Sequence, residues 1–107
     1  MRIELRWLGH ASWSLRMAEH TLLIDPFLDE SPTSPVRSQE VDADYILVTH
    51  GHFDHVADVV TIAQRTNAQV IANYEVAEWF RTRFHLSNSF GMNIGGGKVF
   101  NFSHVRM

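Results

Sequence analysis

Cysteine is absent from this sequence of 107 residues, so the chain has no disulfide and cannot offer a thiolate to a metal. Lysine occurs once, at Lys98, and the 9 Lys and Arg residues form no basic run, which argues against a nucleic-acid partner. Long apolar runs are also missing, since nowhere do about 18 apolar residues follow one another as a membrane-spanning helix requires. The charged and apolar residues that alternate at the N-terminus do not resemble a secretory signal. We therefore expect a cytoplasmic protein with neither a membrane nor a nucleic-acid partner.

The composition is that of a globular chain. Hydrophobic residues make up 45% of the sequence and aromatic residues 11%, which is enough for a core, and the formal net charge is -3. The sequence contains no convincing internal repeat and no linker that would divide it. We expect one domain over residues 1–107.

Hydrophobic periodicity predicts the secondary structure. Apolar and charged residues alternate over 2–8 and again over 12–17, with Gly9 between them, as in a hairpin with one buried face. Residues 20–27 form a third strand that Pro26 stops, and the polar, proline-containing segment 29–40 is an exposed loop. Further along, the pattern predicts a buried strand at 45–49, a helix at 56–66, a strand at 68–72, a helix at 75–84 and a last strand at 99–105. This order indicates an α/β fold with a mixed sheet and two helices.

Three histidines and an aspartate lie within six positions, directly after the strand at 45–49 and directly before a helix. They are His50, His52, Asp54 and His55 in the stretch "HGHFDH". The carboxyl end of a strand in an open α/β sheet is where sites form, and we expect Gly51 to let the backbone turn so that both neighbouring imidazoles face one ion. Surface histidines in a polar turn are the alternative interpretation. The density and context of the cluster favour a metal site.

Imidazole and carboxylate ligands suit zinc, and catalytic zinc sites keep one position open for water. Two pairs of ligands suggest two ions, which could share a hydroxide formed at neutral pH and could polarise a carbonyl or phosphoryl oxygen. The implied reaction is hydrolysis. We expect two Zn ions, with Mn or Fe as alternatives, because an all-His/Asp ligand set suits several divalent metals.

Four segments resemble a known family: "WLGHASWSL", "LLIDPFL", "ADYILVTHGHFDHVAD" and "NIGGGKVFNF". They are similar to the metallo-β-lactamase fold superfamily, and within it to small metal-dependent hydrolases related to the L-ascorbate-6-phosphate lactonases. The resemblance implies that the chain is the N-terminal half of an αββα sandwich. It also implies that His50 and His52 hold a first metal, that Asp54 and His55 hold a second, and that Asp54 is catalytic in moving a proton.

Two further residues are candidates near this site. Asp25 ends the third strand at the same expected edge of the sheet, where its carboxylate could accept the second ring N–H of a ligand histidine or simply form a turn before Pro26. His10 lies in the first hairpin turn, and it could touch the substrate or a metal-bound group, or be solvated. We reject His104 as a ligand, because the resemblance places the next metal histidine beyond residue 107.

The resemblance implies three metal ligands that this chain does not supply, and a sheet face that the chain would leave apolar and open. We therefore expect an incomplete domain that is completed by a C-terminal half or by a second copy of the chain. The expected function is a hydrolase of an ester, lactone or phosphoester bond in a small-molecule substrate, from a truncated, cleaved or split enzyme. The alternative is an inactive or loosely metal-binding half-domain that acts as an oligomerising interaction module.

Overall fold

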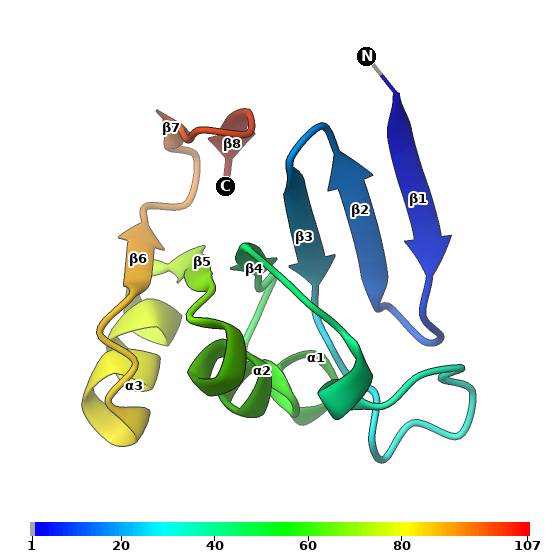
Figure 1. Ribbon diagram of the computed structural model, residues 1–107. Helices are drawn as coiled ribbons and strands as arrows, with labels where there is room; N and C mark the ends of the chain where they lie inside the picture. The colour runs from blue at the N-terminus through cyan, green and yellow to red at the C-terminus, as the bar shows by residue number, and fades with distance from the viewer. Residues whose placement is uncertain (1) are drawn as a thin grey trace.

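The computed structural model describes residues 2–107 and contains one six-stranded sheet with helices on one of its faces (Figure 1). The strands lie side by side in chain order. They are β1 (Ile3–Trp7), β2 (Trp13–Met17), β3 (His20–Ile24), β4 (Tyr45–Leu47), β5 (Gln69–Asn73) and β6 (Ser89–Met92). β2 is antiparallel to both of its neighbours, β1 and β3, whereas β3 to β6 run parallel to one another, so the sheet is mixed.

The connections follow from the strand directions. Short turns join the antiparallel strands, while the parallel strands need crossovers, which contain the helices. Between β4 and β5 lie a single turn, α1 (Phe53–Val56), and α2 (Val59–Thr66), and α3 (Tyr74–Phe84) connects β5 to β6. The predicted helices at 56–66 and 75–84 are confirmed, apart from small shifts at their starts.

The core lies between the sheet and these helices. One face of β3, β4 and β5 contributes Leu23, Ile46 and Val70, all at most 1% exposed, and the helices pack against this face. From the helices come Val59, Ile62, Ala63, Ala77 and Phe80. Because both helices are amphipathic with their apolar sides toward the sheet, they fix the position of the loops at the carboxyl ends of β4 and β5.

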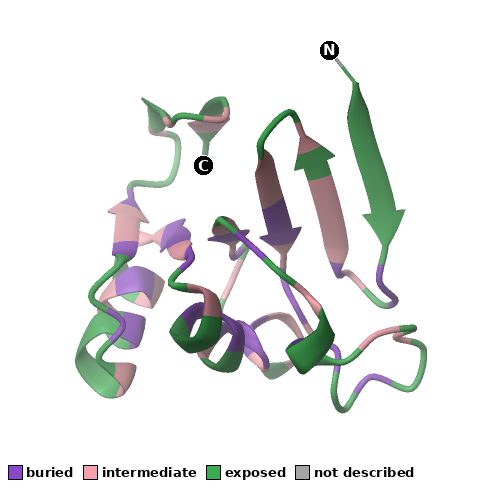
Figure 2. Cartoon of the chain, in the orientation of Figure 1, coloured by how far each residue is buried: buried purple, intermediate pink, exposed green. Residues whose placement is uncertain are grey.

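The face of the sheet that points away from the helices is only partly covered. A two-stranded hairpin, β7 (Gly97–Val99) with β8 (His104–Arg106), lies against it, with ring centroids 4.4 Å apart between Tyr45 and Phe102. The edge strand β1 is exposed along its whole length (Figure 2). Alternation correctly predicted β1 as a strand, but its apolar side chains are not buried: Ile3 is 53%, Leu5 62% and Trp7 56% exposed.

The prediction for the C-terminal segment is wrong in two respects. The strand expected at 99–105 is broken by a turn, because Phe100 N–H donates to the Ser103 carbonyl and the chain folds back as the β7–β8 hairpin. The last strand of the sheet is instead β6, whose sequence "SFGM" is too short and too glycine-containing to show an alternation.

Within residues 2–107, no helix is both long enough and apolar enough to cross a membrane.

Candidate metal centre

The predicted site residues lie where the parallel strands β3 and β4 end. Asp25 N–H donates to the Leu47 carbonyl at 3.0 Å, which ties the end of β3 to the end of β4. Residues 49–55 follow at once, and His52 is the N-cap position of α1. Two segments that are 24 or more residues apart in the sequence therefore meet at one edge, as parallel pairing requires.

Asp25 is the buried centre of this edge. Its side chain is 2% exposed, and its backbone φ is +47°, an uncommon left-handed conformation for a residue other than glycine. The carboxylate accepts hydrogen bonds from Thr49 N–H at 2.7 Å, from the Thr49 hydroxyl at 2.5 Å and from His55 Nδ1 at 2.8 Å. The His55 ring is therefore held with its Nε2 atom directed away from Asp25.

The three histidine rings of the motif lie next to one another. The ring centroids of His50 and His55 are 4.0 Å apart, and those of His50 and His52 are 4.7 Å apart. Thr49 Oγ1 lies 2.8 Å from His50 Nδ1, so the same threonine contacts both Asp25 and His50. The His50 ring therefore has the other two rings of the motif as neighbours, although His52 itself is exposed.

His10 reaches this region from the other end of the sequence. Its Nε2 atom lies 2.8 Å from Asp54 Oδ2, and its ring centroid is 5.7 Å from that of His55. The hydrogen bond from His10 is the main reason why the pKa of Asp54 is lowered from its usual value. Asp54 is therefore a carboxylate at neutral pH, and as an anion it can only accept hydrogen bonds.

Two polar residues that we did not single out from the sequence hold the loop after β3. Ser12 Oγ donates to the Asp25 carbonyl at 2.7 Å and accepts from Phe27 N–H at 2.9 Å. Asp58 is also buried, and its carboxylate accepts from Leu28 N–H at 2.6 Å and from Asp29 N–H at 3.1 Å. Burial raises the pKa of Asp58 despite these bonds. Both residues lie inside the segments that carry the resemblance, but no spacing rule distinguishes them.

The reason we expected for Gly51 is wrong. Gly51 does not have a positive φ, and a Cβ there would meet only Val76 Cγ2 at 3.6 Å, an ordinary contact. The glycine that the site needs is Gly9, whose φ is +89° and whose Cβ would lie 2.8 Å from Thr33 Oγ1. The two imidazoles therefore approach each other without a backbone conformation that only glycine adopts.

The residues at this edge form a donor set that fits a divalent metal. Two groups bring their nitrogen and oxygen atoms within 4.8 Å of one another: Asp25, His50 and His55, and His10, Asp54 and His55. His55 belongs to both groups, whereas His52 belongs to neither and contacts the cluster only through the His50 ring. Imidazole nitrogen and carboxylate oxygen are ligands that zinc, manganese and iron share. Among residues 2–107, the remaining histidines, His20, His85 and His104, belong to no such group.

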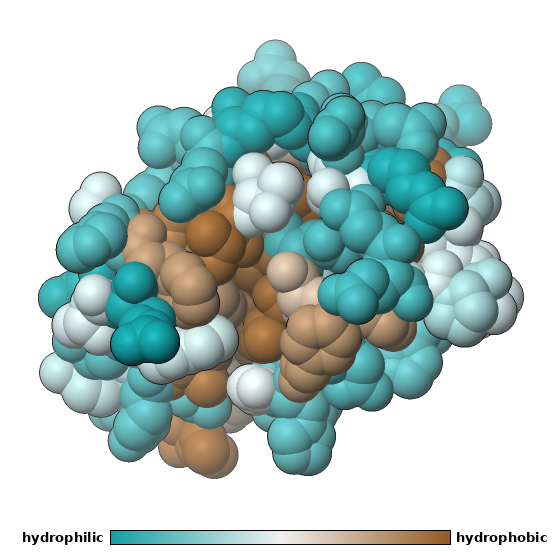
Figure 3. Space-filling model, turned by 90° about the horizontal axis from the view of Figure 1, so that it is seen from below, coloured by the Kyte–Doolittle hydropathy of each residue, from teal (hydrophilic) through white to brown (hydrophobic). Residues whose placement is uncertain are grey.

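Aromatic side chains border the cluster. Phe27 packs edge to face against His10 and against Phe53, at centroid distances of 5.6 and 5.8 Å, and Phe53 is 60% exposed. Viewed from below, the end toward which β3 runs, the surface has a hydrophobic region in its middle that lies beside hydrophilic residues (Figure 3). A substrate at this end would therefore meet apolar as well as polar groups.

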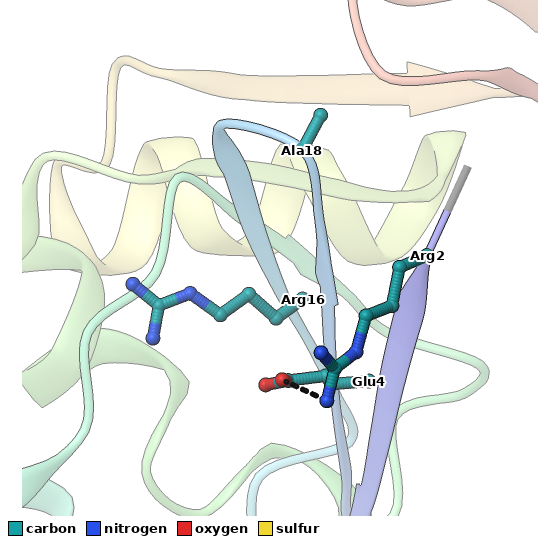
Figure 4. A pocket seen from close by; sticks show the side chains of 4 residues that line it. All are labelled: Arg2, Glu4, Arg16 and Ala18. Carbon is teal, nitrogen blue, oxygen red and sulfur yellow. Dashed lines mark ion pairs between the residues drawn. The ribbon is translucent and has the colours of Figure 1, made fainter.

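A hollow of about 490 Å³ lies elsewhere, lined by Arg2, Glu4, Arg16 and Ala18 (Figure 4). It is at the end of the β1–β2 hairpin opposite the His10 turn, since Ile3 pairs with Met17 there and Trp7 pairs with Trp13 near the turn. Arg2 is paired with Glu4 at 3.3 Å, and Arg16 extends away from this pair. No histidine lines the hollow, so we do not connect it with the metal centre.

A family described as "Beta-lactamase superfamily domain" matches residues 4–104. The chain belongs to this superfamily. Its relatives include a protein of Archaeoglobus fulgidus, 47% identical over 94 residues, and one of Geobacillus thermodenitrificans, 40% identical over 104 residues; both are named UPF0173 metal-dependent hydrolase. Among solved structures, Igni18, a metallo hydrolase from Ignicoccus hospitalis, superimposes with a TM-score of 0.78 at 24% identity. The likeness confirms the predicted metallo-β-lactamase-type fold.

The match covers most of this chain but less than half of each relative. The aligned part is 88% of the chain and 39% of the Archaeoglobus protein, and 97% of the chain and 45% of the Geobacillus protein. For Igni18 the corresponding shares are 92% and 43%. The chain thus spans about two fifths to a half of the length of these superfamily members, as the predicted half of a sandwich requires.

Proposed function

We propose that this chain supplies the first metal ligands of a hydrolase that cleaves an ester, lactone or phosphoester bond in a small molecule. The single observation that carries the proposal is the proximity of the His50 ring to the rings of His55 and His52, with centroid distances of 4.0 and 4.7 Å, just beyond the carboxyl end of β4. The names of the relatives, metal-dependent hydrolase, support the same chemistry.

Four residues would hold the metal: His50, His52, Asp54 and His55. Two Zn ions remain our prediction, with Mn or Fe as alternatives. When bound, a divalent ion supplies Lewis acidity and lowers the pKa of a coordinated water. Asp54, a carboxylate at neutral pH, would both hold metal and exchange a proton with the reacting groups.

Asp25 would not bind the metal itself but would orient the histidines that do. It accepts from His55 Nδ1 at 2.8 Å, which leaves Nε2 as the nitrogen free to bind metal. Asp25 also accepts both donors of Thr49, and Thr49 Oγ1 contacts His50 Nδ1 at 2.8 Å. One buried carboxylate therefore sets the orientation of two ligand rings. Such partners of ligand histidines strongly affect metal affinity.

We further propose that a C-terminal half, or a second copy of the chain, completes the site. Two features support this: the relatives are about twice as long, and the side chains of Ile3, Leu5 and Trp7 are more than half exposed on one face of β1. Exposed apolar faces of this kind mark contacts with another protein surface. A cytoplasmic location remains a prediction from the sequence.

The test is hydrolysis by the purified protein after dialysis against zinc, measured for the chain alone and for the chain mixed with the C-terminal half of the Archaeoglobus relative. We expect cleavage of a p-nitrophenyl ester or of bis(p-nitrophenyl) phosphate that a chelator abolishes and that His50→Ala abolishes. His85→Ala, an exposed histidine outside the cluster, should leave the rate unchanged. Hydrolysis that persists both with chelator and in His50→Ala would rule out the proposed mechanism.

One observation favours a second function, an oligomerising module without activity. The exposed apolar side chains of β1 are available for contact even if no metal binds. This alternative predicts stable self-association of a chain that binds no zinc and hydrolyses neither substrate.

A further inference from the structure

The turn between β1 and β2 is held in a conformation that is unusual for a histidine. His10 has φ +51°, and it follows Gly9 at φ +89°. The indole N–H of Trp7 donates to the His10 carbonyl at 2.9 Å, and Ser12 N–H donates to the Gly9 carbonyl at 2.9 Å. A left-handed conformation at a residue other than glycine is costly, and it persists where surrounding contacts impose it, often at functional sites.

His85 has the same left-handed backbone conformation as His10, but for a different reason. His85 has φ +56°, but it terminates α3, and its backbone N–H donates to the Phe80 carbonyl in an ordinary helix C-cap. His10 ends no helix. Its side chain, unlike that of His85, packs against Phe27 and approaches His55.

In this conformation the His10 ring contacts one oxygen of Asp54. Nε2 of His10 lies 2.8 Å from Asp54 Oδ2, while Oδ1 of the same carboxylate lies 3.8 Å from His55 Nε2. The two oxygens therefore have different neighbours. A carboxylate only accepts hydrogen bonds, so His10 is the donor, and its bond fixes the rotation of the Asp54 side chain.

We propose that His10 is a positioning residue for Asp54: its Nε2–H holds Oδ2, so that Oδ1 stays turned toward His55 Nε2, beside which a metal would be held. The part of this inference that concerns metal rests on the proposed function. The hydrogen bond itself does not, and it can be tested without metal.

The first experiment is NMR of the metal-free chain with ¹⁵N-labelled histidine at one fixed pH. We expect the imidazole ¹⁵N shifts of His10 to move when Asp54 is replaced in Asp54→Ala, and those of His85 to stay unchanged. If the His10 shifts are the same in both proteins, the His10–Asp54 bond is absent in solution and the inference is overturned.

The second experiment measures Co²⁺ binding by the visible absorption of the ion. His10→Leu removes the donor, and His10→Gln keeps a side-chain N–H at a similar reach. We expect His10→Leu to lose about 10- to 100-fold in affinity, as is typical when a residue behind a ligand is removed, and to have an altered spectrum. We expect His10→Gln to restore most of the affinity together with the wild-type spectrum.

His85→Leu and His85→Gln are the matched controls, because they carry the same backbone conformation outside the cluster, and neither should change the spectrum. Wild-type affinity and spectrum in His10→Leu would overturn the inference. The inference would also be overturned if His10→Gln bound Co²⁺ as weakly as His10→Leu does, because His10 would then be a metal ligand itself. A wild-type chain that binds no Co²⁺ would instead contradict the proposed function, and the NMR shifts would still decide whether His10 positions Asp54.

Discussion

Asp25 illustrates what a single residue contributes to this site. It is buried, it accepts three hydrogen bonds from Thr49 and His55, and its own backbone is in the left-handed region. The sequence could indicate it as a candidate, because it ends a strand beside the motif. The sequence could not indicate Thr49 or Ser12, because their roles depend on contacts between segments and no spacing reveals such contacts.

Gly9 and Gly51 provide a matched pair of substitutions. Gly9→Ala places a Cβ 2.8 Å from Thr33 Oγ1 at a φ of +89°, so we expect it to lower the free energy of unfolding by about 1–2 kcal/mol or more. Gly51→Ala adds only a 3.6 Å contact with Val76, and we expect a change within about 0.5 kcal/mol. Urea denaturation measures both. Equal losses in the two variants would contradict the account of the loop.

Asp29 makes stability depend on pH. Its pKa is lowered, first by the Ser38 backbone N–H and next by the Ser38 hydroxyl, each donating at 2.7 Å. A lowered folded-state pKa stabilises the fold above the unfolded value of about 3.9, and this stabilisation is lost as the pH falls through the folded value. We expect Ser38→Ala to cost roughly 1 kcal/mol at pH 7 and clearly less at a pH low enough to protonate Asp29 in the folded protein.

Thermal or urea unfolding of both proteins across this pH range measures the effect. Ser87→Ala, at an exposed position, is the control and should be neutral throughout. If the loss of unfolding free energy in Ser38→Ala grew as the pH fell, Ser38 would not lower the pKa of Asp29.

At the scale of elements, periodicity was a good guide to the position of strands and helices up to residue 84, even for β1, whose apolar face is not buried. The strands β1 to β5 and the helices α2 and α3 fall in predicted segments, apart from the last residue of β5 and the first residue of α3. It failed after residue 85, because β6 has only four residues and the β7–β8 hairpin is held by aromatic contacts such as Phe90 with Phe100, at 5.4 Å, which no local pattern encodes. The site depends on the confirmed elements, since it lies at the ends of β3 and β4.

The start of α3 offers a test of an element next to the site. The Asn73 side chain accepts from Val76 N–H at 2.9 Å and caps the helix, and Val76 faces Gly51. We expect Asn73→Ala to lower the free energy of unfolding by about 1 kcal/mol and Asn73→Asp to keep most of it. Urea denaturation provides the measurement, and an Asn73→Asp protein as unstable as Asn73→Ala would rule out the cap.

For the molecule as a whole, the unburied face of β1 is the feature that most needs an explanation. Ile3, Leu5 and Trp7 pair with Met17, Leu15 and Trp13 of β2, so apolar side chains from both strands lie on the same side of the sheet. The sequence predicted that such a face would be open, but only through the resemblance. Local patterning alone predicted a buried face, because it cannot distinguish a strand covered by another layer from one that is not.

We expect the isolated chain to associate through this face. Sedimentation velocity over a range of concentrations should show oligomers that Leu5→Lys weakens, because a charge would then lie within the apolar contact. Arg6→Glu, on the opposite side of the same strand, is the control and should not change the association. A chain that stays monomeric at every concentration would contradict this expectation.

The most direct test of the central claim, that this edge of the sheet binds divalent metal, is anomalous diffraction at the zinc edge from crystals grown with zinc. The account predicts a peak about 2.0–2.1 Å from imidazole nitrogens of the cluster formed by His50, His52 and His55. Rings that point apart with no peak between them, or zinc bound only at other residues, would contradict it.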